Sequence, residues 1–273
     1  MSADLFRVIL PVEHLERADG FWERMLGLPI DKAVPARHYV RTGGAILVLV
    51  DPSEHGGVHR PLPEWLYFRV PDLDATWVAA QALGCPDLET DEGTGIRDRV
   101  WGDRSFYTRD PDDNRLCFID DVCSQDAPHA ARYAGRDVAN LCKVILPASH
   151  IEKSDSFFTE MLGLEPDTSV PNRHFFPTGS CELALVDSVE HARAHGSQDE
   201  PFRPSPEVVY FAVPDLDAAW ERASRLALPP LQGHDVGVGV QQRVWGERSF
   251  YGLDPSGNPI CFVDDQTLYT GSS

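Results

Sequence analysis

The stretch of sequence that decides the fold is Val100-Trp-Gly-Asp-Arg-Ser-Phe-Tyr-Thr-Arg-Asp-Pro-Asp-Asp-Asn-Arg-Leu-Cys-Phe-Ile-Asp-Asp121. It recurs nearly intact as Val244-Trp-Gly-Glu-Arg-Ser-Phe-Tyr-Gly-Leu-Asp-Pro-Ser-Gly-Asn-Pro-Ile-Cys-Phe-Val-Asp-Asp265. Glycine leads the pair Gly102-Asp103, which favours a two-residue type II′ hairpin turn. The run Asp110-Pro-Asp-Asp-Asn114 places Pro, Asp and Asn where a second turn needs them. Because the runs between the turns alternate and are rich in Val, Phe, Tyr and Ile, each copy predicts three short strands.

The segments upstream of this stretch also occur twice and in the same order, so the chain is a duplication. In the first half, hydrophobic periodicity predicts strands within 6–11, 38–50 and 65–70, and helices within 15–26 and 71–84. The second half repeats these elements within 144–147, 174–186 and 208–213, and within 151–162 and 214–226. The order strand–helix–three strands, used twice in each half, predicts an α+β fold. We expect domains at 1–121 and 141–273, joined by a linker at 122–140.

Composition limits the class of protein. The chain has 273 residues, 42% of them hydrophobic, which is enough for two domains with separate cores. A formal net charge of -19 argues against a nucleic-acid partner, because such proteins need a basic face. The N-terminus lacks a hydrophobic signal segment, and no apolar run is long enough to span a membrane. The 6 cysteines form no Cys-x-x-Cys motif, so we expect a soluble protein of the reducing cytoplasm.

Two motifs point to a known family. The helix start Val70-Pro-Asp-Leu-Asp-Ala75 and the ending Asp-Pro-x-x-Asn-x-x-Cys-Phe, both present in each half, resemble the vicinal oxygen chelate superfamily. That family holds glyoxalase I, bleomycin-resistance proteins, extradiol dioxygenases and fosfomycin-resistance transferases. The resemblance covers 5–121 and 141–265. It implies two tandem domains of paired βαβββ modules, in which each half forms a curved sheet around a ligand cleft. A tandem chain of this kind is expected as a monomer with an internal pseudo-dimer, or as a homodimer.

The resemblance also implies where the family's metal enzymes hold their metal ligands. The first position falls on Arg7 and Lys143, the second on Trp65 and Val208, and the third, a Glu in the family, on Cys117 and Cys261. Cationic side chains repel a divalent ion, and Trp and Val cannot ligate one. We therefore expect no metal at the family's usual position and no cofactor. A one-residue shift in register would offer Glu64 and Glu207, with His38 and Cys117 or His174 and Cys261 completing a relocated site.

Strand alternation predicts which residues face the cleft, because every second residue of a strand lies on the same face. Starting from the implied ligand positions, the set in the first half is Arg7, Ile9, Trp65, Tyr67, Arg69, Arg115, Cys117 and Ile119. In the second half it is Lys143, Ile145, Val208, Tyr210, Ala212, Pro259, Cys261 and Val263. Intervening residues such as Phe118 are expected in the core. Cys117 and Cys261 pack as small hydrophobes, or act as nucleophiles if Arg7 supplies an electropositive setting.

The predicted hairpin at Gly102 adds further candidates. A two-residue turn places Trp101 opposite Arg104 and Arg99 opposite Phe106. The same pairs recur as Trp245 with Arg248 and Arg243 with Phe250. Arg over Trp is a cation–π arrangement that is common in binding surfaces, although a purely structural clamp would use the same residues.

His38 and His174 lie in matching Val-Pro-x-Arg-His segments. Each is either a hydrogen-bonded histidine at a strand end, or a ligand contact or general base, since histidine titrates near neutrality.

The function favoured by these residues is binding of a small organic molecule without a metal, in the manner of the bleomycin-resistance branch, which sequesters an antibiotic or metabolite. No catalytic residue is assigned. The alternative is a lyase, isomerase or extradiol-type dioxygenase with an atypical active site, either metal-dependent through an unusual ligand set or metal-free through His38 or His174. A third possibility is that one half is purely structural. Arg7, Trp65 and Arg69 make the first half richer in binding residues than the second.

Overall fold

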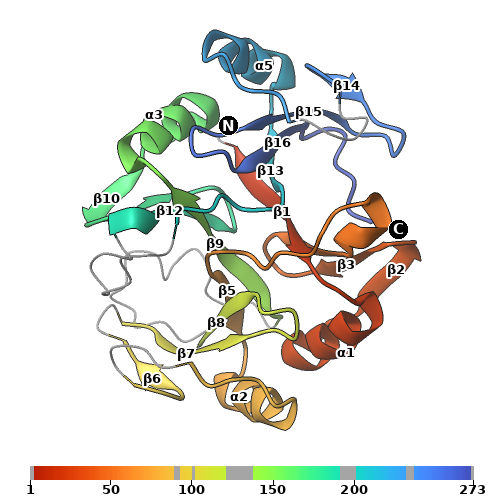
Figure 1. The fold of residues 1–273 in the computed structure, drawn as a ribbon, viewed down its shortest axis with the longest axis vertical. Coiled ribbons are helices and arrows are strands. Elements are labelled where there is room, and N and C mark those ends of the chain that lie inside the picture. The colour runs from red at the N-terminus through yellow and green to blue at the C-terminus, as the bar shows by residue number, and fades with distance from the viewer. Residues whose placement is uncertain are drawn as a thin grey trace. The chain divides into compact units, whose positions relative to one another are not determined.

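The computed structural model describes residues 3–88, 93–99, 102–120, 138–190, 201–231 and 237–271. Trp101 and residues 122–137 of the predicted linker lie outside these ranges. The predicted α+β fold of βαβββ modules is confirmed (Figure 1). The first half contains β1 (Asp4–Pro11), α1 (Leu15–Leu26), β2 (Ile30–Val34), β3 (Arg37–Arg41), β4 (Ile46–Val50), the 3₁₀ helix η1 (Pro52–His55), β5 (Leu66–Val70), α2 (Leu73–Ala82), β6 (Arg97–Asp98), β7 (Arg104–Arg109) and β8 (Arg115–Asp120).

The second half repeats this order. It contains β9 (Asn140–Ala148), α3 (Ile151–Leu162), β10 (Asp167–Val170), β11 (Arg173–Phe176), β12 (Glu182–Asp187), β13 (Val209–Val213), α5 (Leu216–Arg225), β14 (Gln241–Gln242), β15 (Arg248–Leu253) and β16 (Pro259–Asp264). Helix ends follow local chemistry. Asp72 caps α2 by accepting a hydrogen bond from the Ala75 amide at 2.8 Å, and Gly27 ends α1 in the left-handed conformation that glycine adopts without strain.

Contacts divide the chain into two compact units. The first-half unit comprises residues 9–144 and 271–273, and the second-half unit comprises residues 1–8 and 145–270. The division falls inside β1 and inside β9, so the beginning of each of these long strands belongs to the unit of the other half.

The exchanged strand beginnings decide the sheet topology. In the second-half unit, β1 pairs antiparallel with β13 and Arg7 lies opposite Tyr210. In the first-half unit, β9 pairs antiparallel with β5 and Lys143 lies opposite Tyr67. The hydrogen-bonded orders are β14-β15-β16-β13-β1-β4-β3-β2 and β10-β11-β12-β9-β5-β8-β7-β6. The expectation that each half forms a sheet of its own is therefore wrong. Alternation predicts the face a residue occupies, but it cannot select among similar partner strands.

A stack of aromatic rings marks the face of the sheet that packs on the helices. In the first-half unit, Phe118 stacks between Phe68 and Phe106, with ring centroids 5.6 and 5.2 Å apart. Trp22 from α1 and Trp77 from α2 cover this stack. The second-half unit builds the same stack from Phe211, Phe262 and Phe250. We call this the helix side of the sheet and the opposite face the site side.

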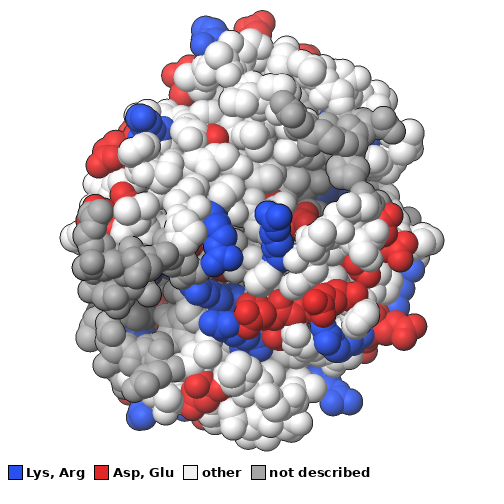
Figure 2. Space-filling model, viewed as in Figure 1, with Lys and Arg blue, Asp and Glu red and all other residues white. Residues whose placement is uncertain are grey.

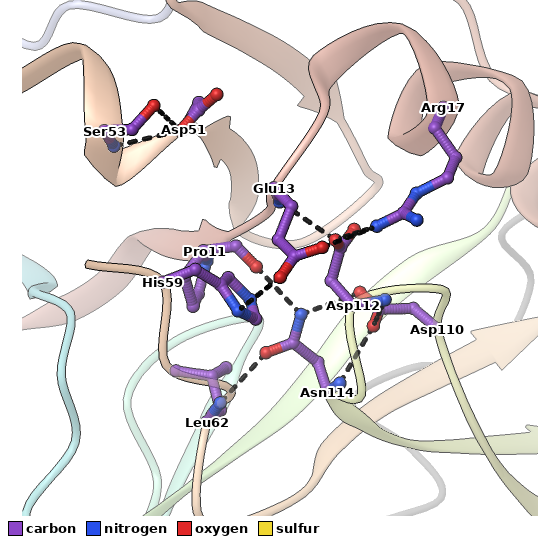
Figure 3. A network of polar contacts seen from close by, with 10 residues as sticks. All are labelled: Pro11, Glu13, Arg17, Asp51, Ser53, His59, Leu62, Asp110, Asp112 and Asn114. Atoms are coloured by element: carbon purple, nitrogen blue, oxygen red, sulfur yellow. Dashed lines mark hydrogen bonds and ion pairs between the residues drawn. The ribbon is translucent and has the colours of Figure 1, made fainter. Parts of the chain in front are cut away.

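The predicted turn at Asp110 is a clamp that joins the two modules of the first half (Figure 3). Asp110 accepts hydrogen bonds from the amide of Asp112 at 2.9 Å and from the amide and side chain of Asn114, each at 2.8 Å. Asn114 in turn donates to the Pro11 carbonyl and accepts from the Leu62 amide, both at 2.9 Å. Because Asn114 is 0% exposed, it ties the turn before β8 both to the end of β1 and to the loop before β5.

The second half repeats the clamp with other neighbours. Asn258 donates to the Pro147 carbonyl and accepts from the Ser205 amide, both at 2.8 Å. Beside the first clamp, Asp112 pairs with Arg17 and accepts from the Glu13 amide. Beside the second, Ser256 accepts from the Ser149 amide, so an ionic contact in one half is a hydroxyl contact in the other.

Charge on the surface is mixed in sign. On the face drawn in Figure 2, acidic and basic side chains lie next to one another rather than in separate fields. Among the residues that the structure describes, no helix has the length and apolarity needed to cross a membrane.

Removing the clamp amide should destabilise the protein. In Asn114→Ala, Asp110, Pro11 and Leu62 each lose a buried hydrogen-bond partner, so we expect the free energy of unfolding to fall by about 3 kcal/mol. Urea denaturation measures this. The matched control is Asp113→Gly in the same turn, because Asp113 has a φ of 69° and the second half has Gly257 there with a φ of 85°. The control should change stability by less than about 1 kcal/mol. Equal losses in the two variants would contradict the role of Asn114.

The clamp should also make stability depend on pH. Burial raises the pKa of Asp110 to about 7 and that of Asp254 to about 6, against hydrogen bonds from Asn114 and Asn258 that act to lower it. Both carboxyls therefore bind a proton more tightly in the folded state than in the unfolded chain, where the pKa is about 4. Their contribution to stability is fully present below about pH 4 and is lost as the pH rises through 6 and 7. Carbon NMR titration of the two side chains measures their pKa values directly. Values of about 4, as in an unfolded chain, would disprove this dependence.

Candidate functional site

The site side of the first-half unit gathers residues from four neighbouring strands. Tyr67 of β5 lies opposite Lys143 of β9 and beside Cys117 of β8, and Cys117 lies opposite Tyr107 of β7. Neighbours in register share a face, so Tyr67, Cys117 and Lys143 occupy the face that alternation predicts. Tyr107 was missed by the sequence analysis, although the same alternation applied along β7 would have found it.

Rings and cations alternate within this cluster. The hydroxyls of Tyr67 and Tyr107 lie 3.3 Å apart. The Lys143 ammonium is 5.3 Å from the centroid of the Tyr67 ring, and the Arg99 guanidinium is 4.9 Å from that of Tyr107. Ser105 holds Arg99 in place, because its hydroxyl accepts from Arg99 Nε at 2.8 Å and its carbonyl accepts from a terminal nitrogen at 3.1 Å. Each cation thus lies within cation–π range of a buried phenol.

Three further predicted residues lie on or beside the same strands. Trp65 packs edge-on against Tyr107 with ring centroids 4.8 Å apart, and Arg115 lies 5.8 Å from the Trp65 ring. Arg69 is buried at the end of β5 and donates to the Asp120 carbonyl at 2.9 Å. The first-half unit therefore brings together Trp65, Tyr67, Arg69, Arg99, Cys117 and Lys143 of the predicted set.

The second-half unit has the same framework with a different cation. The Tyr210 and Tyr251 hydroxyls lie 3.3 Å apart, and Arg243 lies 4.9 Å from the Tyr251 ring. Arg7 takes the place that Lys143 has in the other unit, with its guanidinium 4.1 Å from the Tyr210 ring. Burial raises the pKa of Cys261, although the positive charge of Arg7 acts to lower it. Arg7 thus belongs with Tyr210 and Cys261, not with Trp65 and Cys117 as the sequence analysis grouped it.

A buried carboxylate that the sequence analysis missed lies beside Arg7. Glu247 is 0% exposed and accepts from Arg7 at 2.9 Å, from Trp245 Nε1 at 2.7 Å and from the Tyr269 amide at 2.8 Å. Arg7 also donates to the Tyr269 carbonyl at 2.9 Å. The corresponding residue of the first half is Asp103, one methylene shorter. The difference between Asp103 and Glu247, in turns that otherwise match, is the feature of the sequence that could have shown that the two sites differ.

The predicted hairpin register is wrong in both halves. Arg104 lies opposite Asp98, not Trp101, and Arg248 lies opposite Gln242, not Trp245. The reason is a longer turn in which the Gly102 amide donates back to the Arg99 carbonyl and the Arg99 amide donates to Asp103.

The register correction moves four predicted site residues. Arg104 and Arg248 bind carboxylates, Asp74 at 2.8 Å and Asp264 at 2.9 Å. Phe106 lies on the helix side, in the core stack against Phe118. Trp245 is 39% exposed and reaches the site through Glu247.

His38 and His174 face helices rather than the site side. His38 Nδ1 lies 2.8 Å from Asp19 of α1, and His174 Nδ1 lies 2.6 Å from Asp155 of α3. Each histidine therefore joins the third strand of a module to its helix, which is the structural alternative stated above.

The residues at the family's metal-ligand positions do not fit a divalent ion. Arg7 is 4% exposed and paired with Glu247, and Lys143 lies over Tyr67. Burial raises the pKa of Cys117 as it does that of Cys261, so each thiol stays protonated at neutral pH. Within the described ranges, no three His, Cys, Asp or Glu side chains are placed to hold a metal ion.

The comparisons with known proteins agree with this fold. Crystallised glyoxalase I from Zea mays superposes with a TM-score of 0.64 at 15% identity, covering 97% of this chain and 93% of that one. A candidate dioxygenase from Bacillus subtilis gives a TM-score of 0.62 at 14% identity, covering 97% and 86%. At such identities the likeness shows the fold alone. No curated protein matches the chain.

The family profile described as Glyoxalase/Bleomycin resistance protein/Dioxygenase superfamily matches residues 5–118 and 140–262. With the profile matched twice and the modules present in both halves, this chain is a tandem two-domain member of the glyoxalase/bleomycin resistance protein/dioxygenase superfamily.

Proposed function

We propose that this protein binds a small organic anion with an aromatic part, without a metal, on the site side of the first-half unit. The observation that carries the proposal is the alternation of cations and rings there, with Lys143 over Tyr67 and Arg99 over Tyr107. Trp65 adds apolar area beside Tyr107. Aromatic and arginine side chains supply most of the binding energy in typical recognition sites.

The chemistry of the lining groups favours an anion. Guanidinium and ammonium groups donate hydrogen bonds and cannot accept them. Burial raises the pKa of Tyr107, so its phenol keeps its proton at neutral pH and can also donate. A carboxylate, sulfonate or phenolate would meet donors from Arg99, Lys143 and the tyrosine pair, while its ring packs on Trp65. Such binding suits sequestration of an antibiotic or metabolite.

An enzyme is the second candidate. Two adjacent phenols beside cations could polarise a carbonyl oxygen, which is the electrophilic part of a lyase or isomerase reaction. The same site lacks an activated thiol, because burial raises the pKa of Cys117. Turnover of a bound carbonyl compound, abolished in Tyr107→Phe with binding retained, would favour the enzyme over the binding protein.

Binding should depend on Trp65 more than on its counterpart Val208. With anilinonaphthalene sulfonate as the aromatic anion, we expect Trp65→Ala to raise the Kd at least about tenfold, because truncating a buried aromatic contact typically costs about 2 kcal/mol. Val208→Ala is the matched control at the same position of the second half and should change the Kd less than about twofold. Calorimetry measures both. A larger effect at Val208 would show that the proposal places the site in the wrong unit. If neither the wild type nor the variants bind the probe saturably, the proposal is refuted altogether.

Purified protein should hold no stoichiometric divalent metal at the family's position. Arg7 and Lys143 are cations there, and a divalent ion about 4 Å from a unit charge is repelled by several kcal/mol at an effective dielectric near 20. Elemental analysis of protein prepared without chelators or a metal-affinity tag tests this. About one zinc, iron, nickel or manganese ion per half, lost in Cys117→Ser or Cys261→Ser, would overturn metal-free binding and promote the enzyme.

A further inference from the structure

The chain after β16 returns to the site side of the second-half unit. The Asp265 amide donates to the Val213 carbonyl at 3.0 Å, and the Thr267 hydroxyl accepts from the Arg248 amide at 2.9 Å. Two residues later, the backbone of Tyr269 meets Arg7 and Glu247. Residues 266–270 thus pass the start of β15 and reach Arg7 and Glu247 on the site side of the second-half unit.

Both backbone polar groups of Tyr269 make hydrogen bonds to this site. Its carbonyl accepts from Arg7 at 2.9 Å, and its amide donates to Glu247 at 2.8 Å. Arg7 and Glu247 also bind each other at 2.9 Å, so the ion pair presents a donor and an acceptor side by side. The ion pair therefore recognises the backbone of Tyr269 and not its side chain, as a neighbouring β-strand would.

The burial of the ion pair explains why it needs such a partner. Arg7 is 4% exposed and Glu247 is 0% exposed. A buried ion pair is stable only when further hydrogen bonds satisfy its remaining groups. Tyr269 satisfies one group on each member, and Trp245 satisfies Glu247 further.

We propose that the site side of the second-half unit is a peptide-binding site, and that residues 266–270 of this chain are its occupant. Arg7 and Glu247 bind the backbone carbonyl and amide of Tyr269, beside the tyrosine pair that corresponds to Tyr67 and Tyr107. The segment is thus an internal ligand of this site. This inference goes beyond the anion site of the first-half unit and does not depend on it.

The segment should bind when it is supplied as a separate peptide. A chain ending at Asp265, checked for cooperative thermal unfolding, is titrated with the fluorescein-labelled peptide Gln-Thr-Leu-Tyr-Thr-Gly, which reproduces residues 266–271. We expect saturable binding by fluorescence anisotropy. The full-length chain should bind at least about tenfold more weakly, because its own segment competes at a high effective concentration.

Methylated peptides test the contact itself. Methylation of the amide nitrogen at Tyr269 removes the donor to Glu247 and should weaken binding at least about tenfold, whereas methylation at Leu268 is the matched control and should weaken it far less. Equal weakening by both, or no binding of the unmodified peptide to the folded shortened chain, would overturn the proposal. If the shortened chain does not fold, hydrogen exchange in the intact chain decides. The Tyr269 amide should be protected in the wild type, and exchange there at the rate of an unstructured peptide would refute the contact.

Discussion

The buried side-chain amide of Asn114 is the constraint on which the rest of the first half depends. Its side chain contacts the end of β1 at Pro11 and the loop before β5 at Leu62, and Asp110 holds it from within the turn. Because the turn leads directly into β8, the clamp fixes the register of the strand that carries Cys117. The neighbouring strands β5 and β7 pair with β8 along their lengths, so Tyr67 and Tyr107 are placed by the same anchor.

Duplication has kept this backbone geometry while the side chains around it differ. Asn258 makes the same contacts in the second half, to Pro147 and Ser205. Beside it a serine pair replaces the ionic contact of Asp112 with Arg17. Hydrogen bonds to backbone groups depend on the path of the chain and little on neighbouring residue types, so the clamp tolerates these replacements.

The sequence could predict faces and modules but not partners. Two-residue alternation placed Tyr67, Cys117 and Lys143 on one face, since that pattern depends only on local geometry. It grouped Arg7 with Trp65 because both lie in the first half, whereas β1 pairs with β13 through contacts remote in sequence. The turn at Gly102 was misread because a glycine permits several turn lengths, and the choice depends on hydrogen bonds from Arg99. Glu247 was overlooked as an ordinary turn residue, since nothing local shows that it is buried.

The strand exchange explains how two matching frameworks acquire different chemistry. Arg7 has a planar fork that can bind a carboxylate and a carbonyl together, and in the second-half unit it binds Glu247 and Tyr269. Lys143, at the same position of the first-half unit, is a compact charge on a flexible stem and lies over a ring. Asp103, at the position of Glu247, has a side chain one methylene shorter, which is a second difference between the two sites. The exchange of Arg7 for Lys143 and of Glu247 for Asp103, together with Trp65 in place of Val208, therefore distinguishes the proposed peptide site from the proposed anion site.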